Sequence, residues 1–432
     1  SSCFSARVLR ALLPGGVMSS ARMARDCSLA DLLGGEVPDW VRHRCHGKLQ
    51  MDEWRSDLYT YTGGTRPWVS DSESLPDDCG VYIRGLYDSP PSIQAGDDRK
   101  PMEREGIGIF RPTAAGPALK GQQMVHGGAI ATMFDHLLGR TNTLNGTIGS
   151  TAWLEVRYKK PVPLLAAGSA VFLRARVDNV ENGKKVFLSG EMLDGATGEL
   201  QGEAKGLWIS MDVARLMNTP ATSKLQDSPP KIPIGRVSMP GSGAVTTLGA
   251  KLTREQIGWV LDNDRRMDSG SGESRFRYYL DSERLRRDLL WNPFARTFHI
   301  AVAFTRRCQG PPGRVHGGCL FATLDDAITM FLYARGATDH GIPPGVGLTG
   351  GMVVNYKAGV PLDDEYLIDC GLVGRKTDDK GRLRVTVLAE IRNPEDRTRT
   401  VLTAGKATFV MMEGMPWGRS QPGAHTSAQL YL

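Results

Sequence analysis

The chain has 432 residues with a formal net charge of +6, and charges of both signs are mixed along it. This length exceeds one ordinary domain and suits two or three. The mild positive excess does not favour nucleic acid as a partner, and it is compatible with an anionic small ligand. No apolar run approaches the roughly 18 residues of a membrane span.

Seven cysteines are scattered along the chain, and no CxxC pair occurs. The odd count argues against a disulfide framework, and the spacing fits no zinc site. The sequence therefore predicts no metal site and indicates a reducing compartment.

The first 25 residues contain four arginines, several serines and no acidic residue before Asp26. This composition is typical of a mitochondrial presequence and predicts localisation in the mitochondrial matrix. A basic tail with no targeting role has the same composition and stays open as the alternative. Residues 26–80 are interpreted as an N-terminal extension.

A repeated motif is the most informative feature of the chain. The letters V-H-G-G end at Gly128, with Asp135 nine residues after the histidine, and they recur ending at Gly318, with Asp325 at the same offset. The copies lie 190 residues apart, which is a domain length and not a solenoid period. We therefore predict two domains of one fold, a linker between them and a tail, at residues 81–211, 276–411, 212–275 and 412–432 respectively.

Each motif opens an apolar segment of helical length, and strand-like segments surround it. In the first half we predict a strand, a helix and four strands, in that order, at residues 106–111, 128–143, 150–158, 169–180, 184–193 and 199–211. The second half repeats this order at residues 297–305, 318–334, 347–356, 366–376, 383–392 and 399–411. A third helix is predicted at residues 253–266. Since the motif helices are apolar on most sides, they are expected to be buried. The order predicts an α+β fold in which an antiparallel sheet wraps a long helix.

The Gly-Gly pair marks the start of each helix, where backbone N–H groups are unpaired and the helix dipole is positive. A carbonyl oxygen that develops negative charge would be stabilised there. The aspartate could activate water or attack directly. Gly127 and Asp135 are separated by ~12 Å along one helix, beyond the reach of the carboxylate. Two antiparallel helices would solve this problem, so we predict that Asp135 faces Gly317 and Asp325 faces Gly127.

Other interpretations of these residues stay open. A buried aspartate can be structural, because a scaffold can outlive its chemistry. His126 and His316 can cap the helices or act as acid–base groups, and capping is favoured because the sequence fixes no partner for them. His136 is either a surface residue or a residue that alters the site.

These motifs resemble the signature of hotdog-fold acyl-CoA thioesterases, which include PaaI-like enzymes and the mitochondrial thioesterase-superfamily-member group. The segment G-P-P-G-R-V-H-G-G that ends at Gly318 looks like this signature, and the similarity covers about residues 105–211 and 296–411. The resemblance implies a tandem hotdog fold. It also implies a base or nucleophile at Asp135 and Asp325, and an oxyanion-binding N–H at Gly127 and Gly317.

The resemblance extends to the strand after each helix. Thr151 opens the sequence T-A-W-L-E-V-R-Y-K-K-P, and Thr349 opens T-G-G-M-V-V-N-Y-K. By the family pattern, these threonines help to place the attacking water. Lys159, Lys160 and Lys357 follow, near the family's coenzyme A channel. They could contact phosphates, or they could simply be solvated ends of strands.

Two departures from the family pattern question whether the two sites are equal. The first half lacks the G-P-P-G lead, and the second half has eight more residues between the aspartate and the threonine.

The resemblance implies a thioesterase that hydrolyses a fatty or aryl acyl-CoA, with no cofactor beyond the coenzyme A of the substrate. The alternative is a catalytically idle subunit of a large mitochondrial assembly, such as a respiratory complex or the mitoribosome. Its motivation is the long chain segments outside the repeated units. The sequence leaves open the acyl length and whether the chain forms a homo-oligomer.

Overall fold

The computed structural model describes the following residues: 39–45, 49–50, 69–70, 81–82, 84–87, 105–110, 118–119, 124–143, 149–162, 171–210, 235–237, 245–247, 259–260, 285–292, 297–305, 308–311, 313–332, 340–342, 346–362, 364–394, 396, 398 and 400–412. The segment that resembles a presequence lies outside these residues.

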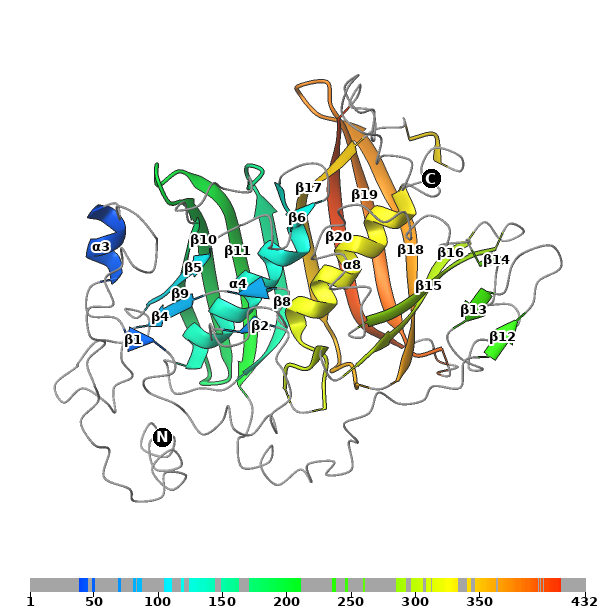
Figure 1. Ribbon diagram of the computed structural model, residues 1–432, viewed down its shortest axis with the longest axis horizontal. Helices are drawn as coiled ribbons and strands as arrows, with labels where there is room; N and C mark the ends of the chain where they lie inside the picture. Colours follow the sequence, from blue (N-terminus) through cyan, green and yellow to red (C-terminus); the bar gives the residue numbers. More distant parts are fainter. Residues whose placement is uncertain are drawn as a thin grey trace, which may run out of the picture.

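One large sheet runs through both halves of the described chain (Figure 1). Its neighbouring strands are antiparallel, as in a meander. The first half contributes, in sheet order, β1 (Leu49–Gln50), β4 (Arg84–Tyr87), β5 (Glu105–Phe110), β9 (Val171–Glu181), β10 (Lys185–Asp194), β11 (Leu200–Ser210) and β8 (Gly149–Tyr158). The second half continues with β17 (Val346–Tyr356), β20 (Val401–Met412), β19 (Leu383–Arg392), β18 (Glu365–Thr377), β16 (Thr297–Phe304), β15 (Leu285–Asn292) and β14 (Trp259–Val260).

The two halves are joined edge to edge at β8 and β17. Leu154 pairs with Val354, and Val156 pairs with Met352, in antiparallel register. All four side chains are buried in one hydrophobic core. Because the register relates the halves by an approximate twofold rotation, each helix start is brought towards the middle of the other helix.

The helices α4 (Gly127–Thr143) and α8 (Gly317–Phe331) lie side by side on the same face of the sheet (Figure 1). They are antiparallel, since Gly128 lies against Ala322 and Gly318 lies against Thr132. The Thr132 hydroxyl donates to the carbonyl of Gly318 over 3.0 Å and so ties the helices together. Both helices are buried on nearly all sides, as their composition predicts.

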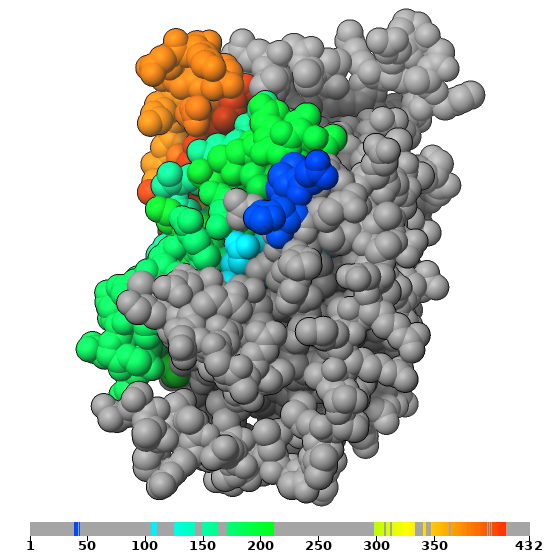
Figure 2. Space-filling model, turned by 90° about the vertical axis from the view of Figure 1, so that its left-hand side faces the viewer, coloured from blue at the N-terminus to red at the C-terminus, as the bar shows by residue number. Residues whose placement is uncertain are grey.

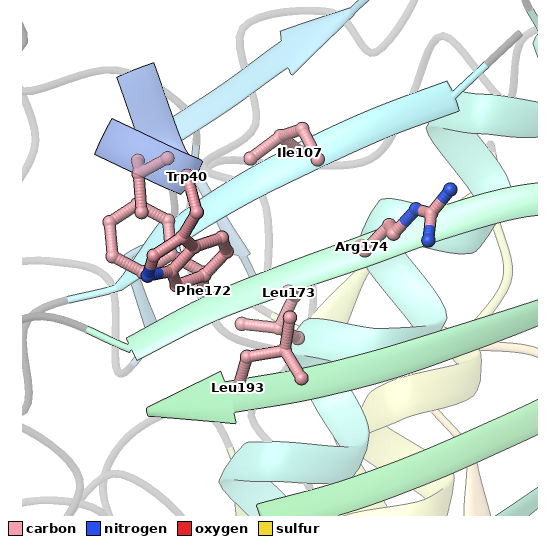
Figure 3. A pocket seen from close by; sticks show the side chains of 7 residues that line it. Trp40, Ile107, Phe172, Leu173, Arg174 and Leu193 are labelled. Atoms are coloured by element: carbon pink, nitrogen blue, oxygen red, sulfur yellow. The ribbon is translucent and has the colours of Figure 1, made fainter. Parts of the chain in front are cut away.

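The short helix α3 (Asp39–Cys45) covers the opposite face of the first half of the sheet (Figure 2). Trp40 meets Phe172 edge to face, with the ring centroids 5.4 Å apart (Figure 3). Phe172 and Leu173 are neighbours on β9 and point to opposite faces, so Leu173 joins the main core while Phe172 does not. A small apolar pocket lies between α3 and the sheet, on the face away from α4 (Figure 3).

The predicted helices and strands of both repeats are confirmed, with ends that differ by a few residues. The turn after β9 holds Asn182 and Gly183 at φ of 52° and 61°, the left-handed conformation of a type I′ hairpin. The helix predicted at 253–266 is wrong at Trp259 and Val260, which form β14. Pairing with β15, which places these two residues at the edge of the sheet, overrides their helical pattern.

Several short strands lie outside the large sheet. They pair as β2 (Val69–Ser70) with β3 (Val81–Tyr82), β6 (Ala118–Leu119) with β7 (Met124–Val125), and β12 (Gly235–Val237) with β13 (Val245–Thr247). The last pair falls within the segment interpreted as a linker. None of the helices in the described ranges is long and apolar enough to cross a membrane.

Candidate active site

The crossed arrangement that the helix length predicts is present in the structure. Asp135 of α4 lies at the start of α8, where its Oδ2 accepts the N–H of Gly318 over 2.7 Å. Asp325 of α8 lies at the start of α4, and a Cβ placed on Gly127 would be 3.1 Å from its Oδ2. We call the place where Asp135 meets Gly317 site A, and the place where Asp325 meets Gly127 site B. Each site therefore takes residues from both halves.

The two glycines of each motif serve different purposes at these contacts. A Cβ on Gly317 would lie 2.8 Å from the Asp135 carboxylate, so the first glycine leaves room for the acid. A Cβ on Gly318 would lie 2.8 Å from the Cα of Thr132, so the second glycine allows the helix backbones to approach. The pair is thus required both by the site and by the packing of the helices.

A threonine from the adjoining strand orients each aspartate. The Thr151 hydroxyl donates to Asp135 Oδ1 over 2.8 Å, and the Thr349 hydroxyl donates to Asp325 Oδ1 over 3.0 Å. The eight extra residues in the second half therefore do not displace its threonine.

Tyr158 and Tyr356 also belong to the site, although sequence reasoning gave them no role. Tyr158 donates to the carbonyl of Gly127 over 2.8 Å, and Tyr356 donates to that of Gly317 over 3.0 Å. Each tyrosine thereby holds a helix start against the sheet. The signal was present in the repeated strand pattern, where each tyrosine stands seven residues after the threonine.

A bulge explains how the threonine and tyrosine of one strand both point at the helix. Seven is an odd spacing, which in a regular strand places two side chains on opposite faces. In β8 the pairing skips one residue between Thr151 and Trp153, and β17 has the same shift between Thr349 and Gly351. The extra residue returns the tyrosine to the face of the threonine.

The motif histidines cap the helices, which confirms the favoured interpretation. The Nδ1 atoms of His126 and His316 accept the N–H groups of Gly128 and Gly318 over 2.9 and 3.0 Å. Burial lowers the pKa of His316 to about 3, and the nearby charges of His136 and Arg140 act in the same direction. His316 is therefore neutral at physiological pH, as an accepting Nδ1 requires.

His136 is not a surface residue, contrary to one of the two expectations. It is 7% exposed, and its ring stacks on that of His316 with the centroids 6.3 Å apart. It lies beside site A because it follows Asp135 on α4.

Burial raises the pKa of both aspartates. The pKa of Asp135 rises to about 6, with the hydrogen bond from Thr151 opposing the rise. The pKa of Asp325 rises to about 7. The Thr349 hydrogen bond opposes this rise, and the negative charge of Asp326 adds to it. Both carboxylates are thus poised near neutral pH, where a general base or nucleophile is effective.

The N–H of the first glycine is the group available to a substrate. Gly128 and Gly318 direct their N–H groups to acceptors within the site. No hydrogen bond from the N–H of Gly127 or Gly317 occurs among the described residues. This N–H lies at a positive helix start, next to a carboxylate. A carbonyl oxygen could bind there while its carbon faces the aspartate.

The three lysines lie at the exposed ends of β8 and β17. Lys159 forms an ion pair with Glu203 over 2.8 Å, and Lys160 pairs with Glu199. Lys357 is exposed and has no ion pair among the described residues. The structure does not bring these side chains to the aspartates. Within the described ranges, no three His, Cys, Asp or Glu side chains are grouped as a metal site requires.

A long helix wrapped by an antiparallel sheet, present twice and joined edge to edge, defines a tandem hotdog fold. Residues 312–400, which begin just before α8 and continue through β19, match the family model of the thioesterase superfamily. The chain is thus similar to that superfamily over this segment, which contains α8 and the strands β17 to β19.

Curated relatives match over about a quarter of the chain. Acyl-coenzyme A thioesterase THEM4 of Bos taurus is 40% identical over 111 residues, which are 26% of this chain and 43% of the relative. The protein of that name from Mus musculus is 35% identical over 112 residues, which are 26% of this chain and 45% of the relative. The chain thus spans less than half the length of these curated relatives.

Solved structures of thioesterases align over most of the chain at low TM-scores. A tesB protein of Mycobacterium avium subs paratuberculosis aligns with a TM-score of 0.42 and 11% identity, covering 71% of this chain and 93% of that one. The 12:0-ACP thioesterase from Umbellularia californica aligns with a TM-score of 0.41 and 7% identity, covering 71% and 94%.

Proposed function

We propose that the chain is an acyl-CoA thioesterase that hydrolyses fatty or aryl acyl-CoA at two composite sites. One observation carries the proposal. Each aspartate is oriented by a threonine of its own half and lies against the glycine at the start of the other helix. A protein with only a structural role has no need to place each aspartate beside the first glycine of the other helix. Thioester cleavage does need this arrangement, because a base and an oxyanion donor must lie on either side of one carbonyl group.

In site A the thioester oxygen would accept the N–H of Gly317, which polarises the carbonyl carbon. Asp135 would then take a proton from water as the water oxygen adds to that carbon, or it would attack the carbon itself. The carbon–sulfur bond breaks, and the coenzyme A sulfur leaves and takes up a proton. In the second route, water afterwards hydrolyses the acyl–aspartate anhydride. Thr151 holds the carboxylate in place through either route.

Steady-state hydrolysis of a panel of acyl-CoAs, short to long and aromatic, tests this proposal. The variants are Asp135→Asn, Asp325→Asn and the double variant. Asp194→Asn, at the last residue of β10, is the matched control. Turnover is expected to fall in each single variant and to vanish in the double variant. Loss in only one single variant would leave one working site.

No turnover by the intact chain across the panel would overturn the proposal. The idle structural subunit would then be the better interpretation, and co-migration of the chain with a large mitochondrial complex on native gels would support it. Matrix localisation is also a proposal, supported by the arginine-rich composition of the first 25 residues. Protease protection after import into isolated mitochondria tests it.

A further inference from the structure

A single peptide bond connects a tyrosine to the aspartate in site A. This bond joins the two motif glycines, so its carbonyl oxygen belongs to Gly317 and its N–H to Gly318. The Tyr356 hydroxyl donates to that oxygen over 3.0 Å, and the N–H donates to Asp135 Oδ2 over 2.7 Å. The hydroxyl, the peptide and the carboxylate therefore form a continuous series of hydrogen bonds, which we call the relay.

The peptide can transmit an effect from the tyrosine because its electrons are delocalised over oxygen, carbon and nitrogen. A donor at the carbonyl oxygen polarises the peptide and makes its N–H a stronger donor. A stronger donor stabilises the charged carboxylate and so lowers its pKa. Burial raises the pKa of Tyr356 well above its ordinary value, and the charge of Asp135 adds to the rise. The tyrosine therefore keeps its proton and remains a donor.

Site B contains a relay of the same kind. The Tyr158 hydroxyl donates to the carbonyl of Gly127 over 2.8 Å. The N–H of the next residue, Gly128, donates to His126 Nδ1 over 2.9 Å and also acts on Asp325, whose pKa it lowers. The N–H at the end of this relay is therefore shared between the histidine and the aspartate.

The relay closes more tightly on the aspartate in site A than in site B. The cap nitrogen, His316 Nδ1, is 3.3 Å from Asp135 Oδ2, whereas His126 Nδ1 is 3.8 Å from Asp325 Oδ2. In each site this nitrogen and the aspartate approach the same peptide N–H. The tyrosine is therefore expected to act more strongly on Asp135 than on Asp325.

We infer that Tyr356 and Tyr158 are positioning residues that set the basicity of Asp135 and Asp325 through the peptide bond between the motif glycines. This inference rests on the proposed function. Each aspartate is then oriented by the threonine of its own half and tuned by the tyrosine of the other half. The crossing of the two halves would thus govern the strength of each base as well as its location.

Other titratable groups also surround the two aspartates. At site A they are His136, His316 and Tyr356, with the charge of Arg140 acting on His316, and at site B they are Asp326, His126 and Tyr158. Replacing a tyrosine by phenylalanine removes one hydroxyl and retains all the other groups. A shift in the pH profile of such a variant therefore reports the loss of the donor.

The test measures pH profiles of single-site proteins that lack one hydroxyl. In the Asp325→Asn background, where site A works alone, Tyr356→Phe weakens the N–H donor and raises the pKa of Asp135. Since activity is lost as the pH falls through this pKa, the acidic limb of kcat/KM should move up by about half a pH unit. The plateau at higher pH should fall by less than about threefold. Tyr158→Phe in the Asp135→Asn background should move the limb of site B the same way, by less.

The position of Tyr356 on β17 separates a local effect from general damage to the strand. The same strand carries Thr349, which binds the aspartate of site B. In the Asp135→Asn background, Tyr356→Phe should leave the limb of site B unchanged. Tyr366→Phe is the matched control, because this buried tyrosine also donates to a backbone carbonyl, that of Pro361 over 3.0 Å. It should shift neither limb.

An unchanged limb of site A in Tyr356→Phe, or equal shifts in both sites, would overturn this inference while the thioesterase proposal stands. Infrared titration gives a second readout that needs no substrate. The band of the protonated Asp135 carboxyl is the one that Asp135→Asn removes, and Tyr356→Phe should make it appear at a higher pH. If the intact chain hydrolysed no thioester, the thioesterase proposal would fail, and the infrared shift would decide this inference by itself.

Discussion

The segment between the aspartate and the threonine is shorter in the first half than in the second, yet the hydrogen bond between these two side chains has a similar length in both halves. Asp135 and Thr151 are 16 residues apart, and Asp325 and Thr349 are 24 apart, with hydrogen bonds of 2.8 and 3.0 Å. The position of each threonine is fixed by its strand, which pairs across the seam between β8 and β17. The connecting segment is therefore free to vary in length without moving the reacting groups.

The halves diverge at the residue that follows each aspartate on its helix. The glycines, aspartates, threonines and tyrosines repeat because each contacts the other half or the adjoining helix. The next residues on the helices, His136 and Asp326, do not repeat, and they place an imidazole beside Asp135 and a carboxylate beside Asp325. Chemistry shared by two sites can thus coexist with different surroundings, and the following predictions test how far that equivalence extends.

The largest effect is expected from filling the space at the first glycine. In the Asp325→Asn background, Gly317→Ala should lower kcat/KM by at least about 100-fold, because its methyl group would collide with Asp135 at 2.8 Å. Gly127→Ala in the Asp135→Asn background should cost less, since the corresponding distance is 3.1 Å. Steady-state kinetics on the best thioester measures both.

Gly371→Ala is the control for these variants, because a Cβ there would meet no atom within 4 Å. If Gly317→Ala impaired site B instead of site A, the crossed assignment of the sites would be wrong.

Removing the threonine hydroxyl is expected to have the next largest effect. Thr151→Val and Thr349→Val keep the shape of the side chain and remove the donor to the aspartate. A hydrogen bond to a charged group contributes about 1.5–3 kcal/mol, which corresponds to a loss of about 10- to 100-fold in kcat. The losses should be similar in the two sites. Thr386→Val, whose hydroxyl contacts only Thr408 among the described residues, is the control. A loss confined to one site would contradict the equivalence of the threonines.

A pH profile of each single-site variant should separate the two aspartates. Only the ionised carboxylate can accept a proton or attack, so activity is lost as the pH falls through its pKa. The pKa is about 6 for Asp135 and about 7 for Asp325, so the acidic limb of site B should lie about one pH unit higher. At pH 6 site A should retain about five times the active fraction of site B.

The role of Asp326 can be examined with the same profiles. Its charge contributes to the raised pKa of Asp325, so Asp326→Asn should shift the limb of site B towards that of site A. If the acidic limbs of the two single-site profiles fell at the same pH without this substitution, the surroundings of the two aspartates would not distinguish their pKa values.

Much of this site could be predicted from the sequence because its signals are local. Helix starts, strand alternation and the nine-residue offset of the aspartate are readable along the chain. The length of a helical segment was sufficient to exclude a carboxylate acting at its own helix start. The roles of Thr151 and Thr349 required the family resemblance, because nothing in their spacing alone joins them to an aspartate.

The features that could not be predicted depend on contacts between distant segments. β8 and β17 come from different halves and pair with each other. The alternation of inward and outward side chains along each strand is the same whether or not the two strands pair, so the sequence does not identify this contact. The bulges that turn Tyr158 and Tyr356 towards the helices are defined by the pairing of β8 and β17 with their neighbouring strands. The bulges therefore cannot be located from the sequence of either strand alone. The burial of His136 similarly follows from the position of His316 on the other helix.

The smallest effect concerns the lysines that the resemblance places near a coenzyme A channel. Lys159 and Lys160 would have to leave Glu203 and Glu199 to bind a phosphate, whereas Lys357 has no ion pair among the described residues. Lys357→Ala should therefore raise KM by about two- to threefold, and Lys159→Ala by less. The effect should weaken between low salt and about 0.15 M salt, where exposed charges are screened beyond about 8 Å.

Lys406→Ala, an exposed lysine on β20, is the matched control. A thioester of pantetheine, which lacks the nucleotide phosphates, decides the cause. If Lys357→Ala raised KM equally for the pantetheine and coenzyme A thioesters, the lysine would not be contacting phosphate, and the solvated strand end would be the correct interpretation. A rise confined to coenzyme A thioesters would show that the channel of one site runs along the end of β17, and Lys159 would then test whether the other site uses β8 in the same way.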